Sequence, residues 1–231
     1  SLAKLNVDLV VDTGDNLGHR DAIKPALAAM QGVLGIPGVF VNGSNDYFAP
    51  APRNPFNYLF SPSKRESHEA LATAEFIEGL ETAGWLNLNN STGTLSVNGS
   101  KLRFVGVDDH HEHLSKLETI GQNAKALKTG ETLIGVTHAP YLAVINAMED
   151  AGVQVLFAGH THGGQVCIPG FGAIITNCDL PANAAKGLSS WSRTGRVMWL
   201  NVCAGLGHSI YAPVRFACKP EVRIIELVAA E

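Results

Sequence analysis

Two histidines separated by one residue are the strongest chemical signal in this chain. His160 and His162 lie in the segment FAGHTHGGQ at 157–165, directly after an apolar run at 153–158. Such a run before glycine predicts a buried strand, so both histidines follow its C-terminal end, where ligand sites of open α/β sheets lie. Imidazole is a common ligand of zinc, iron and manganese, and the small neighbours let both rings face one place.

Three further polar clusters also follow apolar strands. They are DTGDN at 12–16, GSND at 43–46 and THAP at 137–140. Because strand ends of one sheet meet at one edge, we expect Asp15 and His138 to join the two histidines. A carboxylate with three imidazoles suits manganese, iron or zinc better than calcium. An aspartate can bridge two such ions, and a pair of ions about 3.5–4 Å apart supports phosphoester hydrolysis by an activated hydroxide.

The order of these motifs resembles that of the calcineurin-like metallophosphoesterases. The extended segments GDNLGH at 14–19, THAPY at 137–141 and GHTHGGQ at 159–165 are similar to a bacterial branch of membrane- or wall-associated phosphodiesterases. The resemblance implies that Asp15 bridges two metal ions. It further implies that His138 and His160 bind the second ion, and that His162 binds the first.

The chain departs from the family pattern at two places. The family begins with Asp-x-His on its first strand, and none precedes Asp15. We therefore expect residues 1–231 to form a single, N-terminally incomplete domain that lacks its first strand and has an incomplete first metal site.

The second departure is GSND in place of Gly-Asn-His-Asp. Ser44 stands where the family has a metal-binding Asn, and Asn45 where it has a His that contacts phosphate or protonates the leaving group. Asn45 can donate a hydrogen bond to phosphate but cannot deliver a proton at neutral pH. His19 is then the nearest alternative acid. Either Ser44 or Asn45 is the metal ligand, and the sequence leaves this open.

Other polar residues have a structural and a functional interpretation. Arg215 either faces the substrate phosphate or forms a structural ion pair. The run DDHHEH at 108–113 has the residue types of a metal cluster, but its polarity favours a solvated loop. Asp12 is predicted to be structural, because neighbouring residues of a strand face opposite ways. Asp46 matches an acidic position of the family that supports its own loop.

Periodicity predicts a layered α/β fold. Apolar runs indicate strands, and apolar spacings of three and four residues indicate helices. An Asn-Gly pair at 98–99 marks a tight hairpin. We predict an α/β-β/α sandwich of two mixed sheets flanked by helices. Its strands are expected at 7–12, 38–41, 132–136 and 153–157, its helices at 20–34, 68–84, 115–128 and 141–151, its hairpin at 85–107, and further strands within 171–228.

Composition excludes some functions. The net charge of −4 without a basic run argues against a surface for nucleic acid. The sequence has no stretch of 18 apolar residues and does not start with a signal peptide, so membrane association would depend on an absent N-terminal segment. The four cysteines are expected to be buried thiols and do not settle the compartment. Cytoplasmic and membrane-associated locations in a bacterium both stay open.

These observations predict a metal-dependent phosphoester hydrolase with two divalent ions (manganese, iron or zinc). The expected substrate is a small-molecule or lipid-linked phosphomonoester, phosphodiester or pyrophosphate. Two alternatives remain: a non-catalytic metal-binding or scaffold domain that kept the fold, and a hydrolase in which only the second metal site fills.

Overall fold

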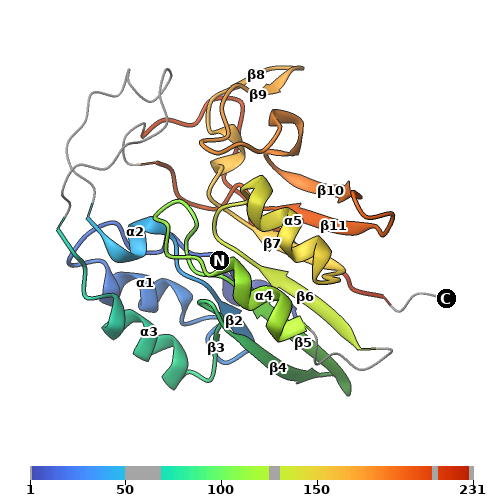
Figure 1. Ribbon diagram of the computed structural model, residues 1–231. Coiled ribbons are helices and arrows are strands. Elements are labelled where there is room, and N and C mark those ends of the chain that lie inside the picture. Colours follow the sequence, from blue (N-terminus) through green and yellow to red (C-terminus); the bar gives the residue numbers. More distant parts are fainter. Residues whose placement is uncertain (1, 50–68, 125–130, 210–212, 229–231) are drawn as a thin grey trace.

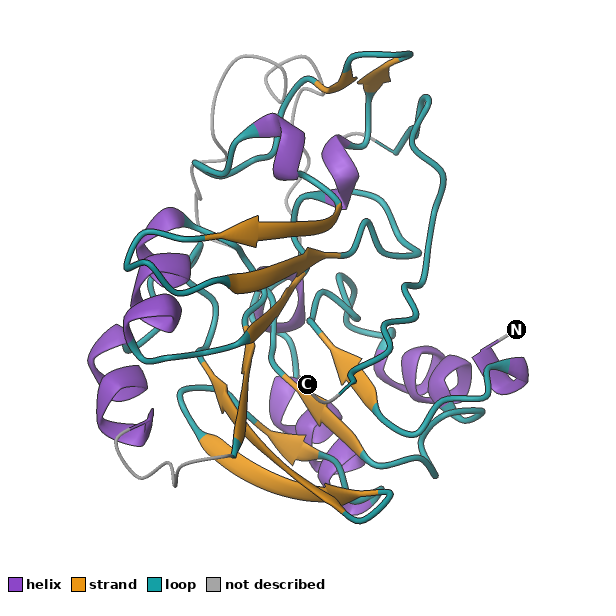
Figure 2. Cartoon of the chain, turned by 90° about the vertical axis from the view of Figure 1, so that its right-hand side faces the viewer, coloured by secondary structure: helices purple, strands orange, loops and turns teal. Residues whose placement is uncertain are grey.

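The computed structural model describes residues 2–49, 69–124, 131–209 and 213–228. Two β-sheets lie face to face between outer layers of helices, as Figures 1 and 2 show. The layered α/β fold predicted from periodicity is therefore confirmed. The helices are α1 (Ile23–Met30), α2 (Ser44–Tyr47), α3 (Thr73–Thr82), α4 (Leu117–Ala124) and α5 (Leu142–Asp150).

The larger sheet is mixed and has the strand order β10-β11-β7-β6-β5-β4. Its four central strands are parallel, and both edge strands pair antiparallel to them. The residues of the two middle strands, β6 and β7, are all buried or half-buried, in keeping with their nearly continuous apolar sequences. The strands are β4 (Thr92–Val97), β5 (Ser100–Gly106), β6 (Thr132–Val136), β7 (Val155–Ala158), β10 (Gly187–Trp191) and β11 (Met198–Val202).

The smaller sheet contains β1 (Val10–Asp12), β2 (Gly38–Phe40) and β3 (Leu86–Asn87), all parallel. Its inner face packs on the larger sheet through a shared apolar core that includes Val39, Leu88, Phe104 and Ile134. Helices α1 and α3 cover its outer face, and α4 and α5 cover the larger sheet. A separate short hairpin pairs β8 (Cys167–Ile168) with β9 (Gly172–Ala173).

Several predicted boundaries change in the structure. The hairpin between β4 and β5 turns at Asn98 and Gly99, whose φ angles of 48° and 79° are those of a tight two-residue turn. The helix predicted at 20–34 is shorter, because residues 31–35 form turns after α1. The region after Val202 was predicted to be strand-rich. Its described residues instead run without strand pairing, apart from a single bridge between Val166 and Phe216.

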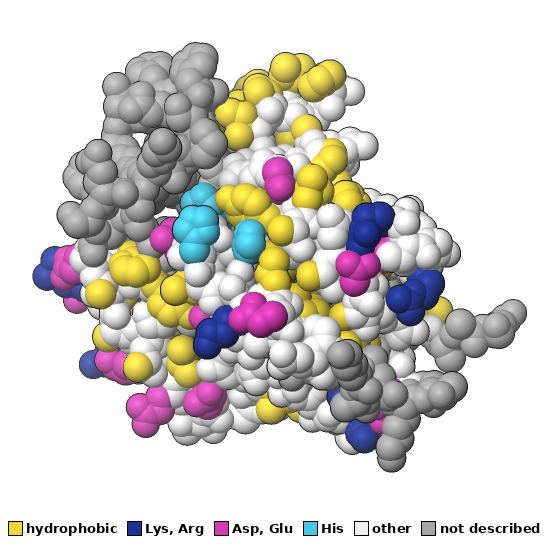
Figure 3. Space-filling model, viewed as in Figure 1, with side chains coloured by type: hydrophobic (Ala, Val, Ile, Leu, Met, Phe, Trp, Pro, Cys, Tyr) yellow, Lys and Arg dark blue, Asp and Glu magenta, His cyan; other side chains and the backbone are white. Residues whose placement is uncertain are grey.

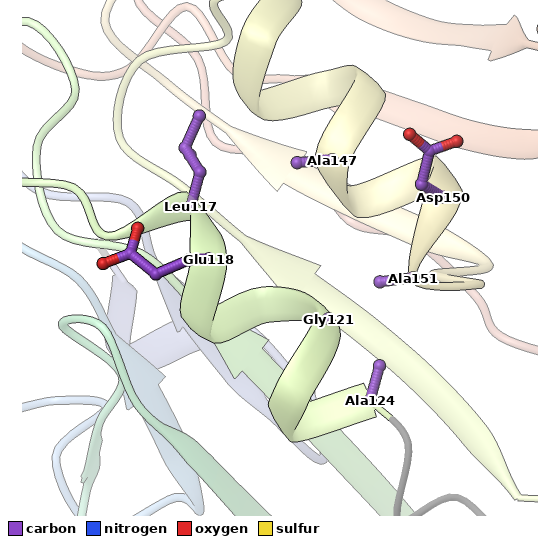
Figure 4. Close-up of a pocket in the computed structure, with 7 residues that line it drawn as sticks. All are labelled: Leu117, Glu118, Gly121, Ala124, Ala147, Asp150 and Ala151. Carbon is purple, nitrogen blue, oxygen red and sulfur yellow. The ribbon is translucent and has the colours of Figure 1, made fainter.

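Two predicted helices extend beyond the described residues, at the start of the one predicted at 68–84 and at the end of the one predicted at 115–128. Within the described residues, no helix is long and apolar enough to cross a membrane. A hollow of about 430 Å³ lies between α4 and α5 (Figure 4) and is lined by Leu117, Glu118, Gly121, Ala124, Ala147, Asp150 and Ala151. None of these residues belongs to the polar clusters that follow the strands.

Candidate functional site

The polar clusters meet where the C-terminal ends of the two sheets come together. Asp15 follows β1 of the smaller sheet, and His138 and His160 follow the neighbouring parallel strands β6 and β7 of the larger sheet. The side chain of His138 is 1% exposed and that of Asp15 is 11% exposed. Packing of one sheet on the other therefore brings residues about 125 positions apart into one buried cluster.

The potential metal-binding atoms of this cluster point toward one another. His138 Nε2 lies 3.4 Å from Asp15 Oδ2 and 3.2 Å from His160 Nδ1. Two ligand atoms bound to one ion at about 2.1 Å lie roughly 3.0–3.4 Å apart, so these separations suit a shared ion. In the described residues no group of three His, Cys, Asp or Glu side chains already encloses an ion site.

The remaining ring nitrogens of both histidines face backbone carbonyls. His138 Nδ1 lies 2.7 Å from the Thr13 oxygen, and His160 Nε2 lies 3.2 Å from the Asn177 oxygen. Metal-binding histidines characteristically have such a partner, which fixes the tautomer and the orientation of the ring. The donor set and its supporting hydrogen bonds therefore fit a divalent cation.

Strained backbone accompanies these side chains. Asp15, His160 and His162 have φ angles of 64°, 65° and 49°, in the left-handed region that few non-glycine residues adopt. Such conformations cost roughly 1–3 kcal/mol each and cluster at functional sites. Three of them at one cluster indicate that the fold positions these groups at the expense of local stability.

Gly43 lets the cluster form. A Cβ atom at this position would lie 2.3 Å from Asp15 Oδ1 and 2.6 Å from His138 Cε1. Because Gly43 has an ordinary extended φ of −107°, its small size matters here and its conformational freedom does not. The glycine of the GSND cluster is thus explained by the close approach of the carboxylate and the imidazole.

Opposite charges dominate the electrostatics. Burial alone would raise the pKa of Asp15, but the charge of His138 and the hydrogen bonds to the carboxylate outweigh it and hold this pKa well below normal. Burial opposes protonation of His138, yet Asp15 raises its pKa to about 10. Without a metal, the pair is therefore a buried ion pair whose imidazole proton a cation must displace.

Asn45 and Asp46 hold the loop around Asp15. Asn45 donates to both carboxylate oxygens of Asp15, from Nδ2 at 2.7 Å and from its backbone N–H at 2.9 Å. The fully buried Asp46 accepts backbone N–H groups from residues 15, 16, 17 and 43. The predicted supporting role of Asp46 is confirmed. Ser44 begins α2 and is 9% exposed, and its metal-binding role stays a prediction.

Asp12 and His162 both interact electrostatically with Asp15 and His138. Asp12 accepts hydrogen bonds from the Gly14 N–H and the Asn16 amide, which supports its predicted structural role. His162 is partly buried, and this burial lowers its pKa to about 4 against the opposing charge of Asp15. A neutral His162 close to a carboxylate has the protonation state that a metal ligand needs.

Two residues predicted to act on the substrate, His19 and Arg215, make other contacts in the structure. The side chain of His19 is 67% exposed, and its Nδ1 accepts the Asp21 N–H at 3.2 Å. The Arg215 guanidinium donates to four backbone carbonyls, those of residues 162, 204, 205 and 207. These bonds favour a structural role for Arg215, through carbonyls in place of the predicted ion pair. General-acid chemistry by His19 stays a prediction without a supporting contact here.

The prediction of a solvated loop at 108–113 is wrong for part of that run. Asp109 is fully buried, and His111 Nδ1 lies 2.8 Å from the Tyr141 hydroxyl. The ring centroid of His111 is 5.0 Å from that of His160. Figure 3 shows histidine side chains gathered on the face over this loop. The sequence contained an indication that this run belongs near the site, because the run follows strand β5 just as the other polar clusters follow their strands.

Comparison with known proteins shows the family of this chain. The calcineurin-like phosphoesterase family matches residues 1–164, and the chain belongs to this family. It is 29% identical over 86% of its length to the uncharacterized protein YpbG of Bacillus subtilis. It is 25% identical over 94% of its length to the uncharacterized metallophosphoesterase YkuE of the same organism. The chain spans 61% and 65% of the lengths of these relatives.

A solved structure is also similar. The phosphopantetheinyl hydrolase of Mycobacterium tuberculosis aligns with 87% of this chain and 81% of its own, with a TM-score of 0.45 and 9% sequence identity. A likeness at this level carries no argument about substrate.

Proposed function

We propose that this chain is the catalytic domain of a metal-dependent phosphoester hydrolase with a binuclear site. The observation that carries the proposal is the convergence of Asp15, His138 and His160, with donor atoms 3.2–3.4 Å apart. Family membership supports the reaction class. Burial of His138 and His160 supports a functional site, because polar side chains are costly to bury without a specific role.

Each residue has a defined task in this proposal. Asp15 would bridge the two ions, His138 and His160 would hold one of them, and His162 would help to hold the other. A bound divalent ion neutralises phosphoryl charge and lowers the pKa of water, with manganese, iron and zinc all suited to these donors. The carbonyls of Thr13 and Asn177 keep the two rings in orientation. Asn45 keeps the Asp15 carboxylate in place through its side-chain amide.

The test uses the full-length protein. After removal of metal with a chelator and addition of manganese, hydrolysis of bis(p-nitrophenyl) phosphate should appear, and His160→Ala should abolish it. The exposed His113 provides a matched control, and His113→Asn should retain full activity, because Asn tolerates its φ of 58°. A protein that binds metal but gives no turnover would instead be a non-catalytic metal-binding domain, the alternative that the changes at Ser44 and Asn45 favour.

The number of metal ions is tested separately. Elemental analysis of protein purified without chelator should give two ions per chain. If His162→Ala leaves activity intact while His160→Ala removes it, and only one ion is present, the mononuclear alternative is correct. Substrate class is then determined by comparing a phosphomonoester, a phosphodiester, a pyrophosphate and a lipid-linked pyrophosphate.

A further inference from the structure

Two histidines of the loop between β5 and α4 and the tyrosine that precedes α5 form an aromatic wall beside His160. Tyr141 lies at the centre of this wall, with ring-centroid distances of 5.1 Å to His110, 6.2 Å to His111 and 6.3 Å to His160. His111 approaches His160 most closely, at 5.0 Å with the ring planes 45° apart. A group bound next to His160 therefore lies within reach of the His111 ring.

The position of His111 is fixed by its surroundings. Asp109, fully buried, accepts the His111 backbone N–H at 3.1 Å through Oδ1, and its carbonyl accepts the Leu114 N–H at 2.9 Å. The His111 ring is held in turn by the Tyr141 hydroxyl, 2.8 Å from Nδ1. A solvated surface loop would not need a buried carboxylate and a side-chain hydrogen bond to place one histidine.

In the tautomer in which the Tyr141 hydroxyl donates to Nδ1, His111 presents a donor at Nε2. Burial above all, and then nearby negative charge, raises the pKa of Tyr141, so the phenol keeps its proton. When the phenol donates to Nδ1, a neutral His111 carries its own proton on Nε2. An oriented N–H donor beside a cation site is the group that binds a phosphoryl oxygen without competing for the metal.

The side-chain amide of Asn45 donates to Asp15 at 2.7 Å, so one of its two N–H groups is already engaged with the carboxylate. We propose that His111, oriented by Tyr141, is a phosphate-binding residue of this site and contacts an oxygen of the phosphoryl group of the substrate. This inference rests on the proposed function, because the phosphate must be brought to the site for His111 to contact it.

Inorganic phosphate is the probe for this proposal. Its competitive inhibition constant is measured against bis(p-nitrophenyl) phosphate with the manganese-loaded full-length protein. Loss of one hydrogen bond to a charged ligand should raise this constant by about tenfold to a hundredfold in His111→Ala. His111→Gln should recover part of the loss, because its amide N–H can still donate. Tyr141→Phe should show a smaller increase, and His113→Asn should match the wild type.

Metal content and thermal unfolding are measured for every variant, so that lost phosphate binding is not confused with lost metal or fold. A phosphate constant of metal-loaded His111→Ala within twofold of that of His113→Asn overturns the proposal. If His111→Ala loses metal or does not fold, His111→Gln decides in its place, and a constant equal to that of the control again overturns it. A wild-type protein without turnover or phosphate inhibition defeats the proposed function, whereas turnover that is indifferent to His111 defeats only this inference.

Discussion

Substitution of Gly43 by alanine tests whether the close approach of Asp15 and His138 is real. The added Cβ would lie 2.3 Å from Asp15 Oδ1 and 2.6 Å from His138 Cε1, both far inside van der Waals contact. Neither neighbour can yield easily, because His138 is 1% exposed and also bound to Thr13. Overpacking of this kind costs about 1–3 kcal/mol of unfolding free energy. The melting temperature should fall by about 2–12 °C for a domain of this size.

The matched control is Gly35→Ala. A Cβ at Gly35 meets nothing within 4 Å, and its φ is not in the left-handed region. Unfolding is followed by circular dichroism with temperature, and bound manganese is measured by elemental analysis. Gly43→Ala should lose both stability and metal, whereas Gly35→Ala should keep both. Equal melting temperatures and equal metal contents in the two variants would refute the geometry on which the candidate site rests.

Three further outcomes follow from the same contacts. Asp46→Asn should lower the free energy of unfolding by about 3 kcal/mol or more, because the Asp46 carboxylate accepts four backbone N–H groups. An unchanged midpoint of urea unfolding would contradict this prediction. Metal binding at pH 8 should release a proton, because the His138 pKa of about 10 leaves the free imidazole protonated, and the release should decrease as pH rises toward 10. Calorimetry in buffers of different ionisation enthalpy measures it, and equal heats would contradict it. Arg215→Lys should destabilise the protein by about 2–4 kcal/mol without changing the phosphate inhibition constant, since lysine cannot reach all of the carbonyls that the guanidinium joins.

The fold layers were predictable because periodicity records burial. The parallel strands β6 and β7 are covered on both faces, so their apolar runs identify them without any neighbour. The Asn-Gly pair at 98–99 likewise specified its hairpin locally. The boundaries of α1 and the irregular path after Val202 could not be predicted, because they depend on which neighbouring surfaces are available for packing.

The sequence alone determined the chemistry of the candidate site. Placement after apolar strands identifies Asp15, His138 and His160 as residues at strand ends. The prediction that these strands belong to one sheet is wrong, because Asp15 follows a strand of the smaller sheet and both histidines follow strands of the larger one. Only the tertiary structure decided which polar runs join them. The run at 108–113 is as hydrophilic as a solvated loop. It nevertheless follows β5 so that the ring centroid of His111 lies 5.0 Å from that of His160. Arg215 has the charge of a phosphate-binding residue, yet its guanidinium donates to backbone carbonyls, among them those of residues 162 and 204. A side chain's partners depend on distances between elements, and those distances are set when the two sheets pack together.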